Sequence, residues 1–198
     1  MAIVVDKVKK RQTIALACKD LIINEDIRSL TISKITSHAG IGKGSFYEYF
    51  ENKEDLVFQL AQILMNEYNI LMEIKLSETK DKLDKLKLFA SFFYDSKYKD
   101  LRKLYNEFTA ISLVSPSKEM QVFQMECFNL YSGWLEQILL EDEDSPELQA
   151  ISKQLSKMLI SSVKGIYITC VSTGNSDRVE QEINSFVEFS YRGKREKE

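Results

Sequence analysis

Glycine and proline are scarce in this chain, and that scarcity restricts the folds that are open to it. Seven glycines and two prolines, Pro116 and Pro146, are spread over 198 residues. An all-β sandwich or barrel needs many tight turns, and most of these turns use Gly or Pro. Apolar residues instead recur at helical spacing in successive segments of the chain. The sequence therefore predicts an all-α fold of about nine helices.

Charge is distributed unevenly along the chain. Residues 1–50 hold eight Lys and Arg against five Asp and Glu, whereas the remaining residues hold 19 against 25. A basic N-terminal part followed by an acidic remainder is typical of a protein that binds a polyanion at one end. A random scatter of solvated charges fits these counts equally well.

The three cysteines, Cys18, Cys127 and Cys170, have no C-x-x-C spacing, and His38 is the single histidine. We interpret the thiols as small apolar core residues in a reducing compartment. No apolar run approaches the roughly 18–20 residues that a membrane span needs. We expect a cytoplasmic protein without a metal site, a cofactor or a membrane-spanning segment.

Residues 31–50, TISKITSHAGIGKGSFYEYF, predict two short helices joined by a glycine-containing turn. Thr31 is a suitable N-cap for the first helix, and Gly40 can adopt the left-handed conformation that ends it. The second helix is expected over about Lys43 to Tyr49. This pattern is typical of a helix-turn-helix, whose second helix lies in a DNA major groove. A small three-helix bundle with a loose turn is the alternative.

The stretch from Leu30 to Leu56 resembles the DNA-binding signature of the TetR family of bacterial transcriptional regulators. The elements that carry the resemblance are Thr31, Ala39-Gly40-Ile41, Gly42 to Gly44, Ser45-Phe46-Tyr47-Glu48-Tyr49-Phe50, and Lys53 with Leu56. The resemblance implies a helix-turn-helix domain over residues 6–66 and an effector-binding and dimerisation domain over residues 67–198.

The resemblance also implies roles for single residues. Positions that commonly hold DNA phosphates are matched by Thr31, Ser45, Tyr47 and Lys53. Positions that can face base edges or the adjacent backbone are matched by Ser33, Lys43, Gly44 and Tyr49. Because Ser33 is short and Gly44 has no side chain, we expect base reading to rest on Lys43 and Tyr49. Lys43 suits guanine O6 and N7.

Enzyme motifs are incomplete in this sequence. The run Gly42-Lys43-Gly44-Ser45 lacks the upstream glycine of a phosphate-binding P-loop, since Ser37 occupies that place. Glycines 40, 42 and 44 have the wrong spacing for a dinucleotide fingerprint. We interpret Glu141 and Glu143 as surface charges of a solvated acidic loop. No catalytic site is expected.

Segment 117–141 is apolar nearly all the way round, which predicts a helix at the centre of its domain. The aromatic residues in and near it can form a large core or line a cavity for an apolar effector. The resemblance favours the cavity, because regulators of this type bind an inducer among their middle helices. The candidate lining residues are Met65, Tyr68, Phe92, Tyr105, Phe108, Phe123, Cys127, Tyr131 and Trp134.

The last two predicted helices, at about 146–173 and 177–191, carry apolar stripes. These stripes can pack on the chain's own core, or they can close a four-helix bundle with a second copy. The resemblance favours the homodimer. The candidate interface residues are Leu155, Leu159, Ser162, Ile166, Ile183, Phe186 and Val187.

Together these features predict a TetR-type DNA-binding transcriptional regulator. We expect a repressor that is released from a palindromic DNA operator by a small, largely apolar effector. The alternative is an all-helical adaptor that is regulated by a protein partner, with DNA binding secondary.

Overall fold

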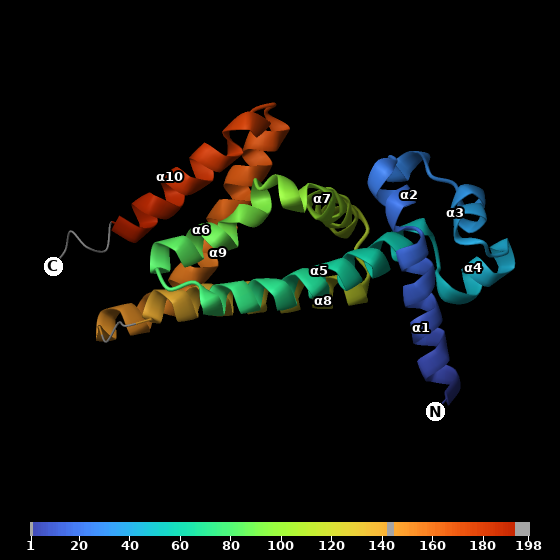
Figure 1. Cartoon of the computed structure of the whole chain (residues 1–198), viewed down its shortest axis with the longest axis horizontal. Helices are drawn as coiled ribbons and strands as arrows, with labels where there is room; N and C mark the ends of the chain where they lie inside the picture. The colour runs from blue at the N-terminus through green and yellow to red at the C-terminus, as the bar shows by residue number, and fades with distance from the viewer. Residues whose placement is uncertain (1, 142–144, 193–198) are drawn as a thin grey trace. The chain divides into compact units, whose positions relative to one another are not determined.

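The computed structural model describes residues 2–141 and 145–192, with side chains from residue 7 onward. This part of the chain is helical and contains no strand (Figure 1). Its ten α-helices are α1 (Ala2–Ala17), α2 (Lys19–Asn24), α3 (Ile32–Ala39), α4 (Lys43–Tyr49), α5 (Lys53–Glu78), α6 (Lys82–Ala90), α7 (Lys99–Val114), α8 (Lys118–Leu140), α9 (Pro146–Ser172) and α10 (Val179–Arg192). The predicted all-α class is confirmed, with one helix more in the described residues than the nine expected.

The additional helix arises at Cys18. The helical spacing of Ile14, Cys18, Leu21 and Ile22 predicts one helix over residues 6–24. The chain instead breaks at Cys18 into α1 and α2, and the amide of Cys18 donates to the carbonyls of both Ile14 (3.2 Å) and Ala15 (3.2 Å). Cys18 is fully buried, and burial raises the pKa of its thiol to about 11. The thiol is therefore protonated at neutral pH and acts as a small packing group.

The helices form two compact units. The first unit comprises residues 1–69 and 100–121, and the second comprises residues 70–99 and those from 122 onward. Helices α5 and α8 each contribute to both units, and most of α7 belongs to the first. The assignment of DNA binding to residues 6–66 and effector binding to residues 67–198 stays a prediction.

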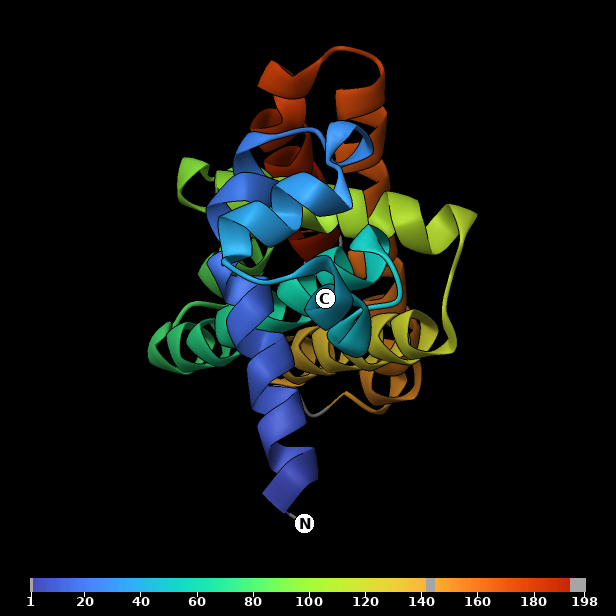
Figure 2. The same ribbon diagram turned by 90° about the vertical axis from the view of Figure 1, so that its right-hand side faces the viewer.

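The first unit is built around α1, which contacts both α3 and α4. Its core holds Ile14, Ile22, Ile35, Phe46 and Phe50, all of them buried. Figure 2 shows α3 and α4 beside α1, and α3 and α4 also contact each other. A three-helix arrangement thus holds the two short helices of the predicted helix-turn-helix.

The second unit is held by packing of α10 against α9 and α6. Lys87 of α6 forms an ion pair with Glu188 of α10 (Nζ to Oε1, 2.6 Å). Hydrogen bonding raises the pKa of Lys87 and lowers that of Glu188. Aromatic rings fill the interior, with Phe93 and Tyr167 5.2 Å apart between ring centroids. This unit therefore has an aromatic core, as its sequence predicts.

Two helix predictions need correction. The sequence predicts one helix over about residues 80–96, but α6 ends at Ala90 and the chain continues as separate 3₁₀ turns, Ser91–Phe93 and Ser96–Tyr98. Helix α8 is not buried on all sides, because Val122 and Met125 are exposed opposite Phe123 and Cys127. No helix within residues 2–141 and 145–192 is both long enough and apolar enough to cross a lipid bilayer.

Candidate nucleic-acid interface

The turn between α3 and α4 is set by two capping residues. The Thr31 hydroxyl accepts a hydrogen bond from the amide of Lys34 (3.2 Å) and so caps the start of α3. Gly40 ends α3 in the left-handed region with a φ of 66°. The amide of Ile41 then donates to the carbonyl of Thr36 (3.0 Å). These bonds form a compact reversal of the kind predicted from the sequence.

Helix α4 has one buried face and one exposed face. Phe46 and Phe50 are buried, with ring centroids 5.4 Å apart. Tyr47, between them in sequence, is 59% exposed. Because the aromatic pair anchors α4 to the core, the opposite face is presented to solvent in a fixed orientation.

The predicted DNA-contacting residues lie mostly on this exposed side. Five of them are exposed: Thr31, Ser33, Lys43, Gly44 and Tyr47. Ser45, Tyr49 and Lys53 are partly exposed. A Cβ atom added to Gly44 would meet no heavy atom within 4 Å, so nothing in the protein itself requires glycine there. The exposed side of α3 and α4 therefore carries several hydroxyl groups and the ammonium of Lys43. At Gly44 this side of α4 has no side chain.

Lys53 is the exception among these residues. Its ammonium donates to three backbone carbonyls, those of Ile27 (2.7 Å), Arg28 (3.1 Å) and Leu30 (3.1 Å). An ammonium has three N–H donors, and all three are used within the chain. In this structure Lys53 holds the segment that leads into the Thr31 cap, and its phosphate contact stays a prediction.

Arg11 makes a second connection that the sequence analysis missed. Its guanidinium donates to Gln59 Oε1 (2.8 Å), to the carbonyl of Tyr49 (3.2 Å) and to Asp55, and it lies 5.1 Å from the ring centroid of Phe50. Arg11 thereby joins α1 to the end of α4 and the start of α5. Only its position at the end of a basic run could have drawn attention to it.

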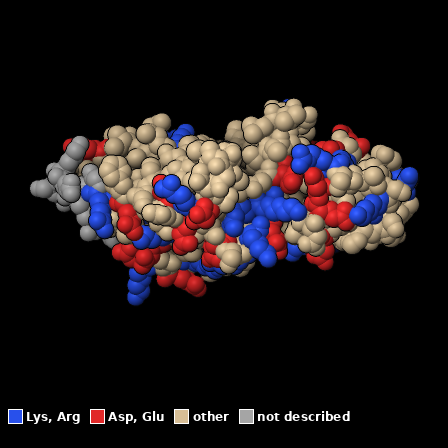
Figure 3. Space-filling model, turned by 90° about the horizontal axis from the view of Figure 1, so that it is seen from above, with Lys and Arg blue, Asp and Glu red and all other residues tan. Residues whose placement is uncertain are grey.

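Lys103 of α7 connects to the same unit from further along the chain. Its ammonium donates to the carbonyls of Ile23 (2.5 Å) and Glu25 (3.3 Å) at the end of α2. Side chains of both charge signs lie next to each other on the face of the molecule that Figure 3 shows.

Comparison with known proteins agrees with this geometry. Residues 15–60 match the family model described as "Bacterial regulatory proteins, tetR family". The matched segment contains α2, α3, α4 and the capping residues described above. The chain carries a DNA-binding domain of the TetR family. It is therefore a DNA-binding transcriptional regulator rather than an enzyme.

Relatives extend the similarity beyond the matched segment. The Fatty acid metabolism regulator protein of Bacillus subtilis is 26% identical over 145 residues, which is 73% of this chain and 74% of that protein. The crystal structure of the regulator FadR from Bacillus subtilis in complex with stearoyl-CoA has a TM-score of 0.65 and 22% identity, and the likeness covers 90% of this chain and 96% of that one. The SmeT–triclosan complex has a TM-score of 0.67 at 16% identity, covering 92% and 90%.

The predicted effector-contacting residues are divided between the two units of the chain. Met65, Tyr68, Tyr105 and Phe108 belong to the first unit, where Phe108 stacks on Phe58 at 5.4 Å between centroids. Phe92, Phe123, Cys127, Tyr131 and Trp134 belong to the second unit. There Tyr131 lies 5.5 Å from Trp134 and 6.0 Å from Phe89, between ring centroids. Most of these aromatic side chains therefore serve as core.

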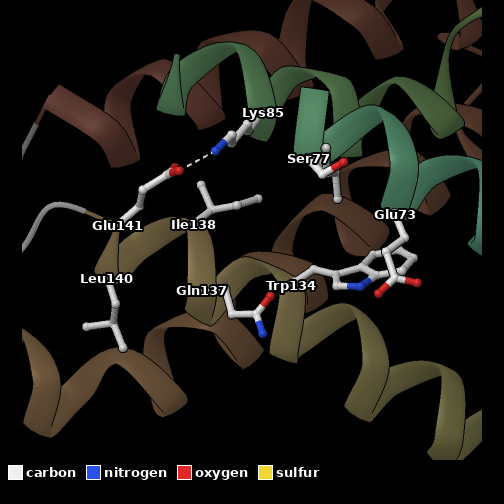
Figure 4. Close-up of a pocket in the computed structure, with 9 residues that line it drawn as sticks. Glu73, Ser77, Lys85, Trp134, Gln137, Ile138, Leu140 and Glu141 are labelled. Atoms are coloured by element: carbon white, nitrogen blue, oxygen red, sulfur yellow. Dashed lines mark hydrogen bonds and ion pairs between the residues drawn. The ribbon is translucent and has the colours of Figure 1, made fainter. Parts of the chain in front are cut away.

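One cavity within the second unit is lined by a predicted residue. Its volume is about 540 Å³. The lining comes from α5, α6 and α8 and from Glu141, which follows α8 (Figure 4). Trp134 is the predicted residue among them. Glu141 is not the solvated surface charge that we expected, because its carboxylate accepts a hydrogen bond from the buried Lys85. Glu143 lies outside the described residues.

The predicted dimer residues differ in their exposure in the single chain, and their role at an interface stays a prediction. Leu159, Ile183 and Val187 are buried in the single chain, and Leu155, Ser162, Ile166 and Phe186 are partly buried. The exposed residues of these two helices include the apolar or small side chains of Ile151, Met158, Ser161, Gly165, Ile168 and Val171 on α9 and Phe189 on α10. A second copy of the chain would meet this second set first.

Proposed function

We propose that this chain is a cytoplasmic repressor that binds a palindromic operator as a homodimer. A small, largely apolar effector releases it from the DNA. The observation that carries the proposal is the exposed α3–α4 surface within the segment that matches the TetR family. A fixed helix with polar groups on its outer face is the arrangement that major-groove recognition requires.

The contacts divide into two kinds. Thr31, Ser45 and Tyr47 offer hydroxyls to phosphates, which fix the position of the protein without reading sequence. Lys43 and Tyr49 are the candidates for base contacts, and the Lys43 ammonium suits guanine O6 and N7. Ser33 and Gly44 lie beside them. The short residue Gly44 allows the backbone of α4 to approach DNA closely.

The homodimer is supported by an apolar stripe on α9. Ile151, Met158, Gly165 and Ile168 are exposed at intervals of seven, seven and three residues, which places them on one side of the helix. Ser161 and Gly165 are small enough to allow close approach of another helix. Phe189 of α10 is 76% exposed. A second copy related by a two-fold axis would cover these side chains in a four-helix bundle.

The effector is supported by the cavity of the second unit and by the names of the similar structures, which are complexes with stearoyl-CoA and with triclosan. A volume of about 540 Å³ lies within the range of small-molecule pockets. The effector acts by preferring the protein state that does not fit the operator.

The test is a selection of DNA from a random pool by the purified protein, followed by titrations with the sequence recovered. We expect an inverted repeat. Lys43→Ala should weaken binding to it by about 1–3 kcal/mol and relax preference at one base pair per half-site. Lys19→Ala removes the same charge from an exposed site on α2 and should change affinity little.

A Lys43→Ala protein that loses equal affinity for the repeat and for random DNA would reduce Lys43 to a backbone contact. Recovery of no preferred sequence would favour the adaptor instead.

A further inference from the structure

The cavity of the second unit has an apolar wall and two acidic side chains. Trp134 and Ile138 are buried and form part of the wall, and Leu76 of α5 is also buried and lines it. Figure 4 shows Glu73 beside Trp134 at one side of the cavity and Glu141 with Lys85 at the other. A ligand that spans the cavity therefore meets a carboxylate near each of its ends.

The charge of Lys85 is already balanced. Its side chain is largely buried and is ion-paired with Glu141. The second carboxylate oxygen of Glu141, Oε2, is buried and has no hydrogen-bond partner among the described residues. An unpartnered buried carboxylate oxygen is costly, and a ligand that brings an N–H donor would satisfy it.

Glu73 supplies the net charge of the cavity. It lines the cavity, but its carboxylate forms no ion pair or hydrogen bond with residues 2–141 and 145–192. Because Lys85 and Glu141 are paired with each other, Glu73 is the one acidic side chain of the lining that no basic side chain balances. The indole ring beside it offers a negative π-face, which also attracts cations.

We propose that this cavity binds a small organic cation with an apolar body, such as an alkylammonium. The ammonium pairs with Glu73 beside the Trp134 ring, and the hydrocarbon lies against Leu76 and Ile138. The inference rests on the proposed function in one respect: it takes this ligand to be the effector.

A fully anionic ligand fits this cavity poorly. A free carboxylate or phosphate would face Glu73 and Glu141, while the single cation of the lining, Lys85, is already paired. The chain is therefore expected to differ in ligand charge from a regulator that binds an acyl-CoA in a cavity of this kind. Selectivity for cations over anions of equal chain length is the property to measure.

Trp134 is the only tryptophan of the chain, so intrinsic fluorescence reports on this cavity. The experiment titrates the full chain with octylamine, and separately with octanoate, at low salt and neutral pH. We expect octylamine to change Trp134 emission in a saturable manner and to bind at least tenfold more tightly than octanoate.

Two variants test the role of the carboxylate. Glu73→Gln keeps the size and polarity of the side chain but removes its charge, and it should weaken octylamine binding about tenfold. Glu67→Gln makes the same change at an exposed residue of α5 outside the cavity and should leave the affinity within twofold. Both residues are exposed, so both variants are expected to fold.

The proposal is overturned if octanoate binds as tightly as octylamine, if octylamine leaves Trp134 emission unchanged, or if Glu73→Gln binds octylamine as the wild type does. These outcomes concern ligand charge only. Operator binding is measured separately on protein without octylamine, so a failed amine titration with intact operator binding refutes this inference alone. Failure of operator binding refutes the proposed function.

Discussion

At the scale of single residues, Gly44 is a position where the requirements of folding differ from those of DNA binding. Its backbone is in helix α4, and an added Cβ would meet open space. Alanine is more favourable than glycine in a helix by about 0.5–1 kcal/mol. Folding alone therefore gives no reason for glycine at this position, whereas close approach of a DNA backbone does.

Gly44→Ala is expected to keep or slightly raise the melting temperature while it weakens operator binding about tenfold. The added methyl group stands between α4 and the DNA. Thermal unfolding and fluorescence anisotropy with labelled operator measure the two effects on the same sample. Unchanged operator affinity would show that DNA does not approach α4 at this residue.

Lys53 illustrates a side chain whose role depends on partners distant in sequence. Its three carbonyl partners lie 23 to 26 residues earlier in the chain. A hydrogen bond to a charged group contributes about 1.5–3 kcal/mol to stability, and exposure to solvent reduces this contribution. We infer that Lys53 orients the α3–α4 surface by holding the backbone that precedes α3.

Lys53→Met should lower the melting temperature and weaken binding to all DNA sequences. The slope of log affinity against log salt should stay close to that of the wild type, because no phosphate contact is lost. A phosphate contact at Lys53 would instead reduce the slope by roughly 0.9. A salt titration of Lys53→Met, with Lys19→Met as the control for charge, distinguishes these outcomes.

At the scale of helices, local sequence determines the helix-turn-helix well. The expected range of α4, Lys43 to Tyr49, is the observed one, and Thr31 and Gly40 cap α3 as expected. Capping and turn preferences act over a few residues, so sequence alone reveals them. The ties made by Arg11, Lys53 and Lys103 join residues 23 to 80 positions apart, and no local pattern contains them.

The face of α9 could not be predicted for a different reason. This helix is apolar on two sides, with Leu159 and Val163 buried and with Met158 and Ile168 exposed. Periodicity identifies both stripes but cannot tell which one meets α10 of the same chain. The choice follows from tertiary packing, which buries the first stripe and leaves the second exposed.

Ile168→Glu should therefore dissociate the homodimer without unfolding the protomer. Ile168 is 55% exposed, so a carboxylate there is tolerated in the single chain but must be desolvated in a dimer. Ile70→Glu, at a residue of α5 that is 62% exposed, is the matched control and should remain dimeric. Sedimentation velocity measures both. If the Ile168→Glu protein is as dimeric as the control, the interface lies elsewhere.

At the scale of the whole molecule, α5 links the two units covalently. It begins at Lys53, beside the helix-turn-helix, and it carries Glu73 and Leu76 of the cavity in its second half. A continuous helix of 26 residues is about 39 Å long, so a change in tilt favoured by a ligand at one end can move the other. By thermodynamic linkage, an effector that weakens operator binding must itself bind the operator complex more weakly.

The central claim is that α3 and α4 read a DNA sequence. The most direct measurement is the ratio of dissociation constants of the wild-type protein for the selected inverted repeat and for a scrambled DNA of equal length, at about 0.15 M salt. Specific regulators bind their sites typically about 10³-fold or more tightly than other DNA. We predict a ratio of at least about 10³. A ratio near unity, with both affinities lost as salt rises, would contradict the account.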